Sequence, residues 1–411
     1  MSSSLRTVEE HLEDVLGRVR SVEAIEVAVA DAAGLTLRES VRARVDLPAF
    51  DNSAMDGFAV RFTDVAAAAP RSPVPLRVVA DLPAGTGDDP ALATGEAARI
   101  MTGSPVPTDA DAIVPFEDTA QGLADSLDRI DVQRAPRASG AHIRRRGEDA
   151  RAGDEVLPPG VLLGPLQRAA AAAAGVDRVR VSRRPRVVVV STGSELVPSG
   201  RPLERGQIPE SNGELLAGLA VECGAEIVLR TTVADDGDGP AEVVAQAQEL
   251  GADVVVFSGG VSAGAYEVVK TSLAGAMSFA GVAMQPGKPQ GFGALYDGTL
   301  LFGLPGNPVS SAVSFEVFVR PALLAAQGRS TLARPMLRIP AARGWRTPPG
   351  RRQYLPVSID RGDPDGWRAV PATSGGSHLA GGLGRADAYA VVPTEVEMVG
   401  AGDLVDVMLI S

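Results

Sequence analysis

The sequence predicts a multidomain α/β plus β protein. A central α/β domain with a parallel-type sheet is flanked by a β-rich N-terminal module and a small all-β C-terminal domain. Three observations predict this architecture. At 411 residues the chain is too long for a single hydrophobic core. Apolar runs at 187–190 and 254–257 alternate with helical patterns, which is typical of strands buried in a parallel sheet. On either side of this region the apolar runs are short and are interrupted by proline and glycine.

The N-terminal part is expected to begin with one helix and to continue in short strands. Thr7 and Glu10 form a capping box, and apolar residues then recur at helical spacing. Between about residues 45 and 141 the short apolar runs predict a β-rich module. Residues 165–174 predict a second helix, because Pro165 is well suited to the first helical position.

From Arg186 onward strands and helices alternate, which implies right-handed crossovers between parallel strands. Pro308 again suits the first position of a helix. After about Ser330 only short strands are expected. The predicted strands of the α/β domain are 187–190, 226–233 and 254–257, its helices are 214–223, 240–250 and 309–326, and the C-terminal strands are 336–339, 354–359, 388–392 and 404–410.

Composition excludes several classes of function. The net charge is −12 and the densest basic cluster is residues 144–146, so nucleic acid is not an expected partner. With three histidines and the single Cys223, a structural zinc site is not expected, and the apolar pattern around Cys223 predicts a buried thiol. Residues 1–10 lack the features of a signal peptide, and no apolar stretch of about 20 residues occurs. We therefore expect a cytoplasmic protein without a membrane span.

Residues 50–60 contain a dense polar group between apolar residues. Asp51, Asn52, Ser53 and Asp56 lie close together there. A helix disfavours such side chains because they compete for backbone hydrogen bonds, and a half-buried strand would alternate polar with apolar residues. We predict a loop that is held by apolar anchors and presents oxygen ligands.

Two loops that combine glycines with hydroxyls directly follow predicted strands. In an open parallel sheet ligands bind at the carboxyl ends of the strands, so both loops are expected along one edge. Glycines let backbone amides approach an anion. Neither loop has the G-x-G-x-x-G spacing of a dinucleotide site, and an ordinary strand–helix turn is the alternative for the second loop. The loop residues are Thr192, Gly193, Ser194, Ser258, Gly259, Gly260, Ser262 and Gly264.

Acidic residues near these loops suggest a metal ion. Magnesium uses one or two carboxylates together with substrate phosphate oxygens, so acids beside an anion-binding loop predict metal-bridged phosphate chemistry. Scattered charge on an acidic surface is the alternative. The acids near the loops are Glu195, Asp235, Asp236 and Glu267, and together with Asp51, Asp56 and Asp149 they exceed what solvated loops require.

Two further segments are interpreted as turns. Residues 285–289 contain a glycine and Lys288, but their spacing is wrong for a P-loop, and Pro289 occupies the place of the required hydroxyl residue. Residues 304–308 form a stiff turn, which would bring Lys288 near a helix N-terminus only if the fold joins the two segments.

Together these motifs resemble the molybdopterin molybdenumtransferase family, which includes MoeA and the matching domain of gephyrin. The resemblance covers nearly the whole chain, and the motifs occur in family order. The segments that carry it are 51–60, 99–107, 143–149, 191–196, 258–264, 286–289 and 303–310.

The resemblance implies an elongated homodimer with four domains in each subunit. Residues 1–45 and 142–180 would form a mixed linker and dimerisation domain, 46–141 a β-rich lid-like domain, 181–327 a MogA-like molybdopterin-binding domain, and 328–411 the C-terminal β-barrel domain. The implied reaction inserts molybdate into adenylated molybdopterin, requires Mg²⁺ and releases AMP. Other cofactor-synthesis proteins and apo-molybdoenzymes are possible partners.

Site residues are carried over from the family motifs in the same way. Catalytic roles are implied for Asp56, Arg144, Asp149, Glu195 and Glu267. Metal binding is implied for Asp56, Glu195, Asp235 and Asp236. Contacts to molybdate are implied for Lys288, Arg351 and Ser377, and further substrate contacts for the residues of the two loops named above and for Pro305 and Asn307.

This chain departs from the family pattern at three positions. Ala265 stands where an acid is common, Glu267 where an Asp is common, and Gln285 where a Lys is common. An amide donates a weaker hydrogen bond to an oxyanion than an ammonium does, so we expect weaker molybdate binding. A scaffold protein that binds molybdopterin and a paralogue with altered oxyanion specificity are the alternatives. An adenylyltransferase is disfavoured, because the MogA-like enzyme resembles only the middle of this chain.

Overall fold

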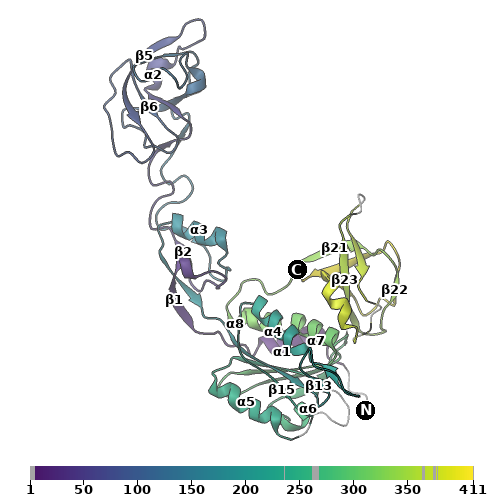
Figure 1. Ribbon diagram of the computed structural model, residues 1–411. Helices are drawn as coiled ribbons and strands as arrows, with labels where there is room; N and C mark the ends of the chain where they lie inside the picture. The colour runs from purple at the N-terminus through teal and green to yellow at the C-terminus, as the bar shows by residue number, and fades with distance from the viewer. Residues whose placement is uncertain are drawn as a thin grey trace.

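The computed structural model describes residues 5–410 except 236, 262–267, 363–365, 374–375 and 377. The chain is elongated (Figure 1). A strand-rich module lies at one end of a slender arm, and the central α/β domain and the C-terminal domain lie at the other end. The predicted multidomain α/β plus β architecture is confirmed.

The central sheet has six strands in the order β15-β12-β16-β20-β19-β17. Four of them are parallel, as predicted: β15 (Glu226–Val233), β12 (Arg186–Thr192), β16 (Val254–Ser258) and β20 (Leu300–Leu304). The sequence analysis did not anticipate that β19 (Pro289–Ala294) and β17 (Ser278–Gly281) extend the sheet in antiparallel orientation.

Helices cover both faces of this sheet (Figure 1). Along β12, Val187 and Val189 join one hydrophobic cluster and Val188 and Val190 join another, as expected for a strand that is buried on both sides. The capping box at Thr7 is confirmed. One face carries α1 (Val8–Leu16), α4 (Asn212–Glu222), α7 (Pro308–Ser314) and α8 (Arg320–Ala326), and the other carries α5 (Gly239–Glu249) and α6 (Val268–Ser272).

The helix predicted at 309–326 is continuous but not uniform. A π-helical turn, Phe315–Val319, joins α7 to α8, and Pro321 follows it without the N–H that an α-helical bond to Val317 would need. By length and composition Pro308–Ala326 would suffice to cross a membrane, but 89% of it is buried inside the protein. Its apolar character therefore matches its position in the core.

The prediction of a loop at residues 50–60 is wrong at Asn52–Ser53, which form a short buried strand, and in its second half. Gly57–Val60 is β4, a fully buried inner strand. Gly57 is required there, because a Cβ would lie 2.1 Å from the carbonyl oxygen of Val114. The module also contains β3 (Asn52–Ser53), which pairs with β9 (Ile143–Arg144), α2 (Phe62–Val65), β5 (Val74–Leu82), β6 (Glu96–Ile100), β7 (Ala112–Pro115) and β8 (Arg129–Val132).

The arm is built from segments on both sides of this module. Its elements are β1 (Ala24–Ala28), paired with β11 (Arg178–Ser182), β2 (Val41–Arg42), paired with β10 (Glu155–Leu157), and α3 (Pro165–Ala173), which begins at the predicted proline.

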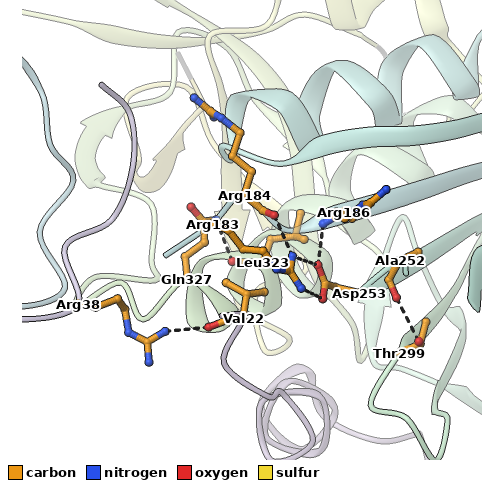
Figure 2. Close-up of polar contacts among 10 residues, drawn as sticks. All are labelled: Val22, Arg38, Arg183, Arg184, Arg186, Ala252, Asp253, Thr299, Leu323 and Gln327. Carbon is orange, nitrogen blue, oxygen red and sulfur yellow. Dashed lines mark hydrogen bonds and ion pairs between the residues drawn. The ribbon is translucent and has the colours of Figure 1, made fainter. Parts of the chain in front are cut away.

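Buried polar contacts join the arm to the central domain (Figure 2). Arg38 Nη1 donates to the carbonyl of Val22, and Ser182 Oγ donates to the carbonyl of Gln327. The buried Gln327 amide donates in turn to the carbonyl of Leu323 and to that of Cys223. The predicted burial of Cys223 is confirmed, and burial raises the pKa of its thiol to about 12.

Asp253 is the charged centre of the same junction. Arg183 donates to both of its carboxylate oxygens at 2.7 and 2.8 Å, and the backbone N–H of Arg186 donates to Oδ2 at 2.7 Å. We expect Asp253→Ala to lower the free energy of unfolding by roughly 2 kcal/mol, because the half-buried Arg183 guanidinium loses its counter-ion and keeps only the carbonyl of Arg184, while the Arg186 amide loses its acceptor. Chemical denaturation measures this effect. Asp177→Ala, which removes an exposed ion pair with Arg44, is the control and should change nothing measurable.

The C-terminal domain forms a curled sheet that starts in the central domain. Its order is β18-β23-β25-β27-β21, and β24 pairs with β23. A parallel bridge pairs Ala341, directly after β21, with Ala369 of β24, so the sheet curves back on itself. The strands of this sheet are β18 (Met284–Gln285), β21 (Met336–Pro340), β23 (Arg352–Asp360), β24 (Arg368–Pro371), β25 (Ala388–Val392) and β27 (Leu404–Leu409). The C-terminal domain also contains the pair β22 (Trp345–Arg346) and β26 (Met398–Val399). In the central domain, β13 (Leu196–Val197) pairs with β14 (Ile208–Pro209) beside the main sheet.

Candidate functional site

A cleft of about 650 Å³ lies at the carboxyl edge of the central sheet. The loops that follow β15, β12, β16 and β20 all contribute to it, which agrees with the edge expected from the sequence. The two predicted loops are therefore neighbours. The predicted site residues that line the cleft are Thr192, Glu195, Asp235, Ser258, Gly259, Gly260, Lys288, Pro305 and Asn307.

Hydrogen bonds join the walls of the cleft. Asn212 Nδ2 donates to Ser258 Oγ at 2.7 Å and to the carbonyl oxygen of Gly306 at 2.6 Å. Ser258 Oγ lies 3.2 Å from Ser311 Oγ, and Thr192 Oγ1 donates to the carbonyl of Ser258. Sequence reasoning missed Asn212 and Ser311, because no motif links them to the glycine loops. They tie the loops after β16 and β20 to α4 and α7.

Steric constraints explain why glycines follow β16. Gly259 has φ of +96°, and a Cβ there would lie 2.5 Å from Thr192 Oγ1. Gly260 has φ of +66°. Only glycine allows this left-handed backbone and this close approach of the neighbouring loop.

Two carboxylates lie on one side of the cleft. Glu195 and Asp235 both line it, and the loops that carry them are tied by hydrogen bonds between Ser194 and Asp235 in both directions, at 3.1 and 3.2 Å. Gly193 makes room for the Glu195 carboxylate, since a Cβ would lie 2.6 Å from its Oε2. Among the described residues no group of three or more His, Cys, Asp or Glu is arranged to hold a metal ion.

The cleft is also lined by the cation Lys288. The loop before it is fixed by the buried Gln290, whose Nε2 donates to the carbonyl of Gly287 and to Ser314 Oγ, both at 2.7 Å. Asn307 and Pro308, at the start of α7, line the same cleft. The fold thus joins the two turn segments, which the sequence analysis had left open.

Arg351 lies beside this loop and is held by Gln285. Arg351 Nη1 donates to Gln285 Oε1 at 2.6 Å, because β18 pairs in parallel with β23 directly after Arg351. The sequence predicts Gln285 only as a hydrogen-bond donor to the oxyanion that is weaker than a lysine. In the structure it is also the acceptor that orients the Arg351 guanidinium.

Variants of Gln285 separate its two effects. We expect Gln285→Leu, which removes the acceptor, to raise the molybdate concentration for half-maximal rate about threefold to tenfold. Gln285→Lys adds a cation, and the sequence analysis expects it to lower that concentration. Initial rates at varied molybdate measure both. A rise in both variants would show that orienting Arg351 outweighs the added charge.

Three predicted catalytic residues lie far from the cleft within one chain. Asp56 lies between β3 and β4 and Arg144 lies in β9, both in the strand-rich module, which is at the far end of the molecule (Figure 1). Asp149 follows β9, and its backbone N–H donates to the carbonyl of Leu47. The backbone N–H of Thr102, and then its hydroxyl, hold the pKa of Asp56 below its ordinary value. One chain therefore does not bring Asp56 together with Glu195 and Asp235.

Some predictions fall outside the described residues, and a further described residue, besides Asn212 and Ser311, was missed. His378 comes from the C-terminal domain and lines the cleft, although no motif in the sequence pointed to it. The predicted residues outside the described part of the chain are Asp236, Ser262, Gly264, Glu267 and Ser377, together with the departure at Ala265.

Comparison with known proteins identifies the family. Residues 6–175 match the model described as MoeA N-terminal region (domain I and II), 188–325 the probable molybdopterin binding domain, and 338–410 the MoeA C-terminal region (domain IV). The chain belongs to the MoeA family. Its transferase class, as expected from the resemblance, is confirmed by curated MoeA relatives.

The MoeA relatives match over almost their whole length. Molybdopterin molybdenumtransferase 2 of Mycobacterium tuberculosis is 42% identical over 97% of this chain and 98% of its own. Molybdopterin molybdenumtransferase 1 of the same organism is 36% identical over 99% of both chains. Among solved structures, a molybdopterin biosynthesis MoeA protein of Pyrococcus horikoshii aligns with a TM-score of 0.80 and 33% identity over 99% of both chains.

Proposed function

We propose that this chain is a molybdopterin molybdenumtransferase, which inserts molybdate into adenylated molybdopterin and releases AMP to yield molybdenum cofactor. The observation that carries the proposal is the composition of the cleft. Backbone amides and hydroxyls, a lysine and the three carboxylates of Glu195, Glu210 and Asp235 converge on one space, with Arg351 held beside it. A tetrahedral oxyanion needs cations and hydrogen-bond donors, while a phosphoanhydride needs a divalent cation.

Each part of the cleft has a place in the proposed reaction. Hydrolysis of the phosphoanhydride consumes one water and gives AMP and molybdopterin. Two dithiolate sulfurs then replace oxygens of molybdate, and these oxygens take up protons and leave as water. Lys288 and Arg351 would hold the negative charge of molybdate, while the glycine loops would orient the phosphate groups through their amides.

Glu195 and Asp235 fit a magnesium ion. Both supply the hard oxygen ligands that Mg²⁺ prefers, and substrate phosphate oxygens would complete the coordination. When bound, the ion polarises the phosphoryl oxygens. In this scheme the chain would hold the two carboxylates at a fixed separation. The hydrogen bonds between Ser194 and Asp235 favour such an arrangement.

A second copy of the chain would complete the site. Asp56, Arg144 and Asp149 lie at the end of the arm, so they would act in the cleft of the partner subunit of a homodimer. We also expect a cytoplasmic location and transient contact with other cofactor-synthesis proteins and with apo-molybdoenzymes.

A direct assay tests the proposed reaction. Purified protein is mixed with adenylated molybdopterin and Mg²⁺, and AMP release is followed with and without molybdate. We expect release that depends on molybdate and stops on chelation of the metal. Tight binding of the adenylated pterin without turnover would instead support the scaffold alternative or a paralogue that needs another oxyanion.

A further inference from the structure

A second cavity of about 870 Å³ lies beside the cleft, and none of the motifs accounts for it. Its walls come from α4, β13 and β15 of the central domain and from the 3₁₀ helix Ala380–Arg385 of the C-terminal domain. Leu196, Glu210, Ser211 and Pro308 line both the cavity and the cleft, so the two spaces adjoin along these residues. A molecule bound in the cleft can therefore extend into the cavity.

The cavity has the lining of a site for a flat, partly polar ring. Seven of its residues are apolar, and its volume lies within the range of small-molecule sites, on the order of 300 to 1,000 Å³. Arg230 pairs with Glu214 at the side of the cavity, and a guanidinium stacks well on a planar heterocycle. The apolar residues are Leu196, Val197, Pro198, Leu215, Pro308, Ala380 and Leu383.

Two carboxylates give the cavity a preference for hydrogen-bond donors. Glu210 Oε1 already accepts from Ser191 Oγ and from the backbone N–H of Gly213, at 2.8 and 2.7 Å. Its Oε2 accepts from no residue in the described part of the chain, and Glu214 uses only Oε2 to pair with Arg230. Ionised carboxylates are acceptors only, so the cavity suits a ring edge that presents adjacent N–H donors.

We propose that this cavity binds the pteridine end of the substrate. The inference rests on the proposed function, because it assumes a substrate with anionic groups in the cleft. Of the two heterocycles in an adenylated pterin, the pteridine presents an amino group next to a ring N–H, which matches acceptor-only carboxylates. The amino group of adenine lies next to a ring nitrogen that is itself an acceptor, which a carboxylate does not satisfy.

Filling the cavity from two different elements, the 3₁₀ helix and β15, tests this assignment. Ala380 and Thr232 are both exposed, and both line the cavity but not the cleft. We expect Ala380→Trp and Thr232→Trp to weaken binding of adenylated molybdopterin at least tenfold, while the affinity for AMP stays unchanged. Calorimetric titration with each ligand measures this. In the turnover assay the KM for the pterin substrate should rise and the KM for molybdate should not.

Gly381→Trp is the matched control. Gly381 lies in the same 3₁₀ helix, is not a lining residue, and a Cβ there would meet nothing within 4 Å. This variant should bind both ligands like the wild type. Unchanged pterin affinity in both filled variants would overturn the proposal, and selective loss of AMP binding would assign the cavity to adenine instead. If the wild-type protein binds the pterin without turnover, the proposed reaction fails, while the binding comparison still decides the occupant of the cavity.

Discussion

Two inactive variants of this chain, Asp149→Ala and Lys288→Met, are expected to restore activity to each other when they share a dimer. Each variant alone should lose about 100-fold in rate, which corresponds to roughly 2.7 kcal/mol of lost transition-state stabilisation. Lys288→Met keeps an unbranched side chain and removes the charge that lines the cleft. Asp149→Ala removes a carboxylate at the other end of the arm.

The expected restoration follows from where the two residues lie. If the strand-rich module of one subunit serves the cleft of its partner, a mixed dimer has one site with both changes and one site with neither. Equal amounts of the two variants, unfolded together and refolded, should then recover about a quarter of wild-type activity, because half of the dimers are mixed and each has one intact site. Molybdate-dependent AMP release provides the readout.

The same mixture also identifies the opposite arrangement. If each subunit used its own Asp149 and its own Lys288, both sites of a mixed dimer would be damaged and the mixture would stay inactive. A tagged copy of one variant shows by co-purification that mixed dimers formed. Inactivity of a mixture that contains mixed dimers would contradict a site shared between subunits.

Local signals in the sequence predicted most of the regular elements. The capping box at Thr7, the prolines that open α3 and α7, and the β-branched run of β12 each act through the backbone or side chains of their own segment. Such signals can be recognised without knowledge of distant contacts. The carboxyl-edge position of the two glycine loops followed from the same strand pattern.

The errors and omissions have a common cause in contacts between distant segments. Gly57 belongs to a strand because its backbone packs against Val114, and nothing near Gly57 in the sequence indicates that partner. Asn212 and Gln290 matter through hydrogen bonds to residues that are far away or on another element. The role of Gln285 likewise depends on Arg351, which reaches it only through the pairing of β18 with β23.

His11 is a buried histidine whose charge state limits the stability of the fold in acid. It is 3% exposed, and its ring meets that of Phe318 edge to face at a centroid distance of 4.7 Å. Nδ1 has no hydrogen-bond partner among the described residues. Burial, assisted by the nearby Arg6, lowers the pKa of His11 to about 4, from an ordinary value near 6.5. The folded protein therefore keeps the imidazole neutral under conditions in which the unfolded chain protonates it.

This difference predicts a loss of stability on acidification. Above pH 6.5 the imidazole is neutral in both states and has no effect on the pH dependence. Between pH 6.5 and pH 4 the unfolded chain binds the proton and the folded chain does not, so the free energy of unfolding should fall by about 3 kcal/mol through this group alone. Below pH 4 both states are protonated and the loss reaches its limit.

Replacement of His11 by a ring that cannot titrate isolates this contribution from that of the carboxylates. His11→Phe keeps an aromatic ring against Phe318, so at pH 7.5 its unfolding free energy should stay near that of the wild type. Denaturant titrations from pH 7.5 to pH 4 should then show a shallower decline for the variant, with a difference of about 3 kcal/mol accumulating between pH 6.5 and pH 4. Parallel curves for the two proteins would mean that the folded state takes up the proton as readily as the unfolded chain does, and that the environment of His11 does not disfavour the imidazolium.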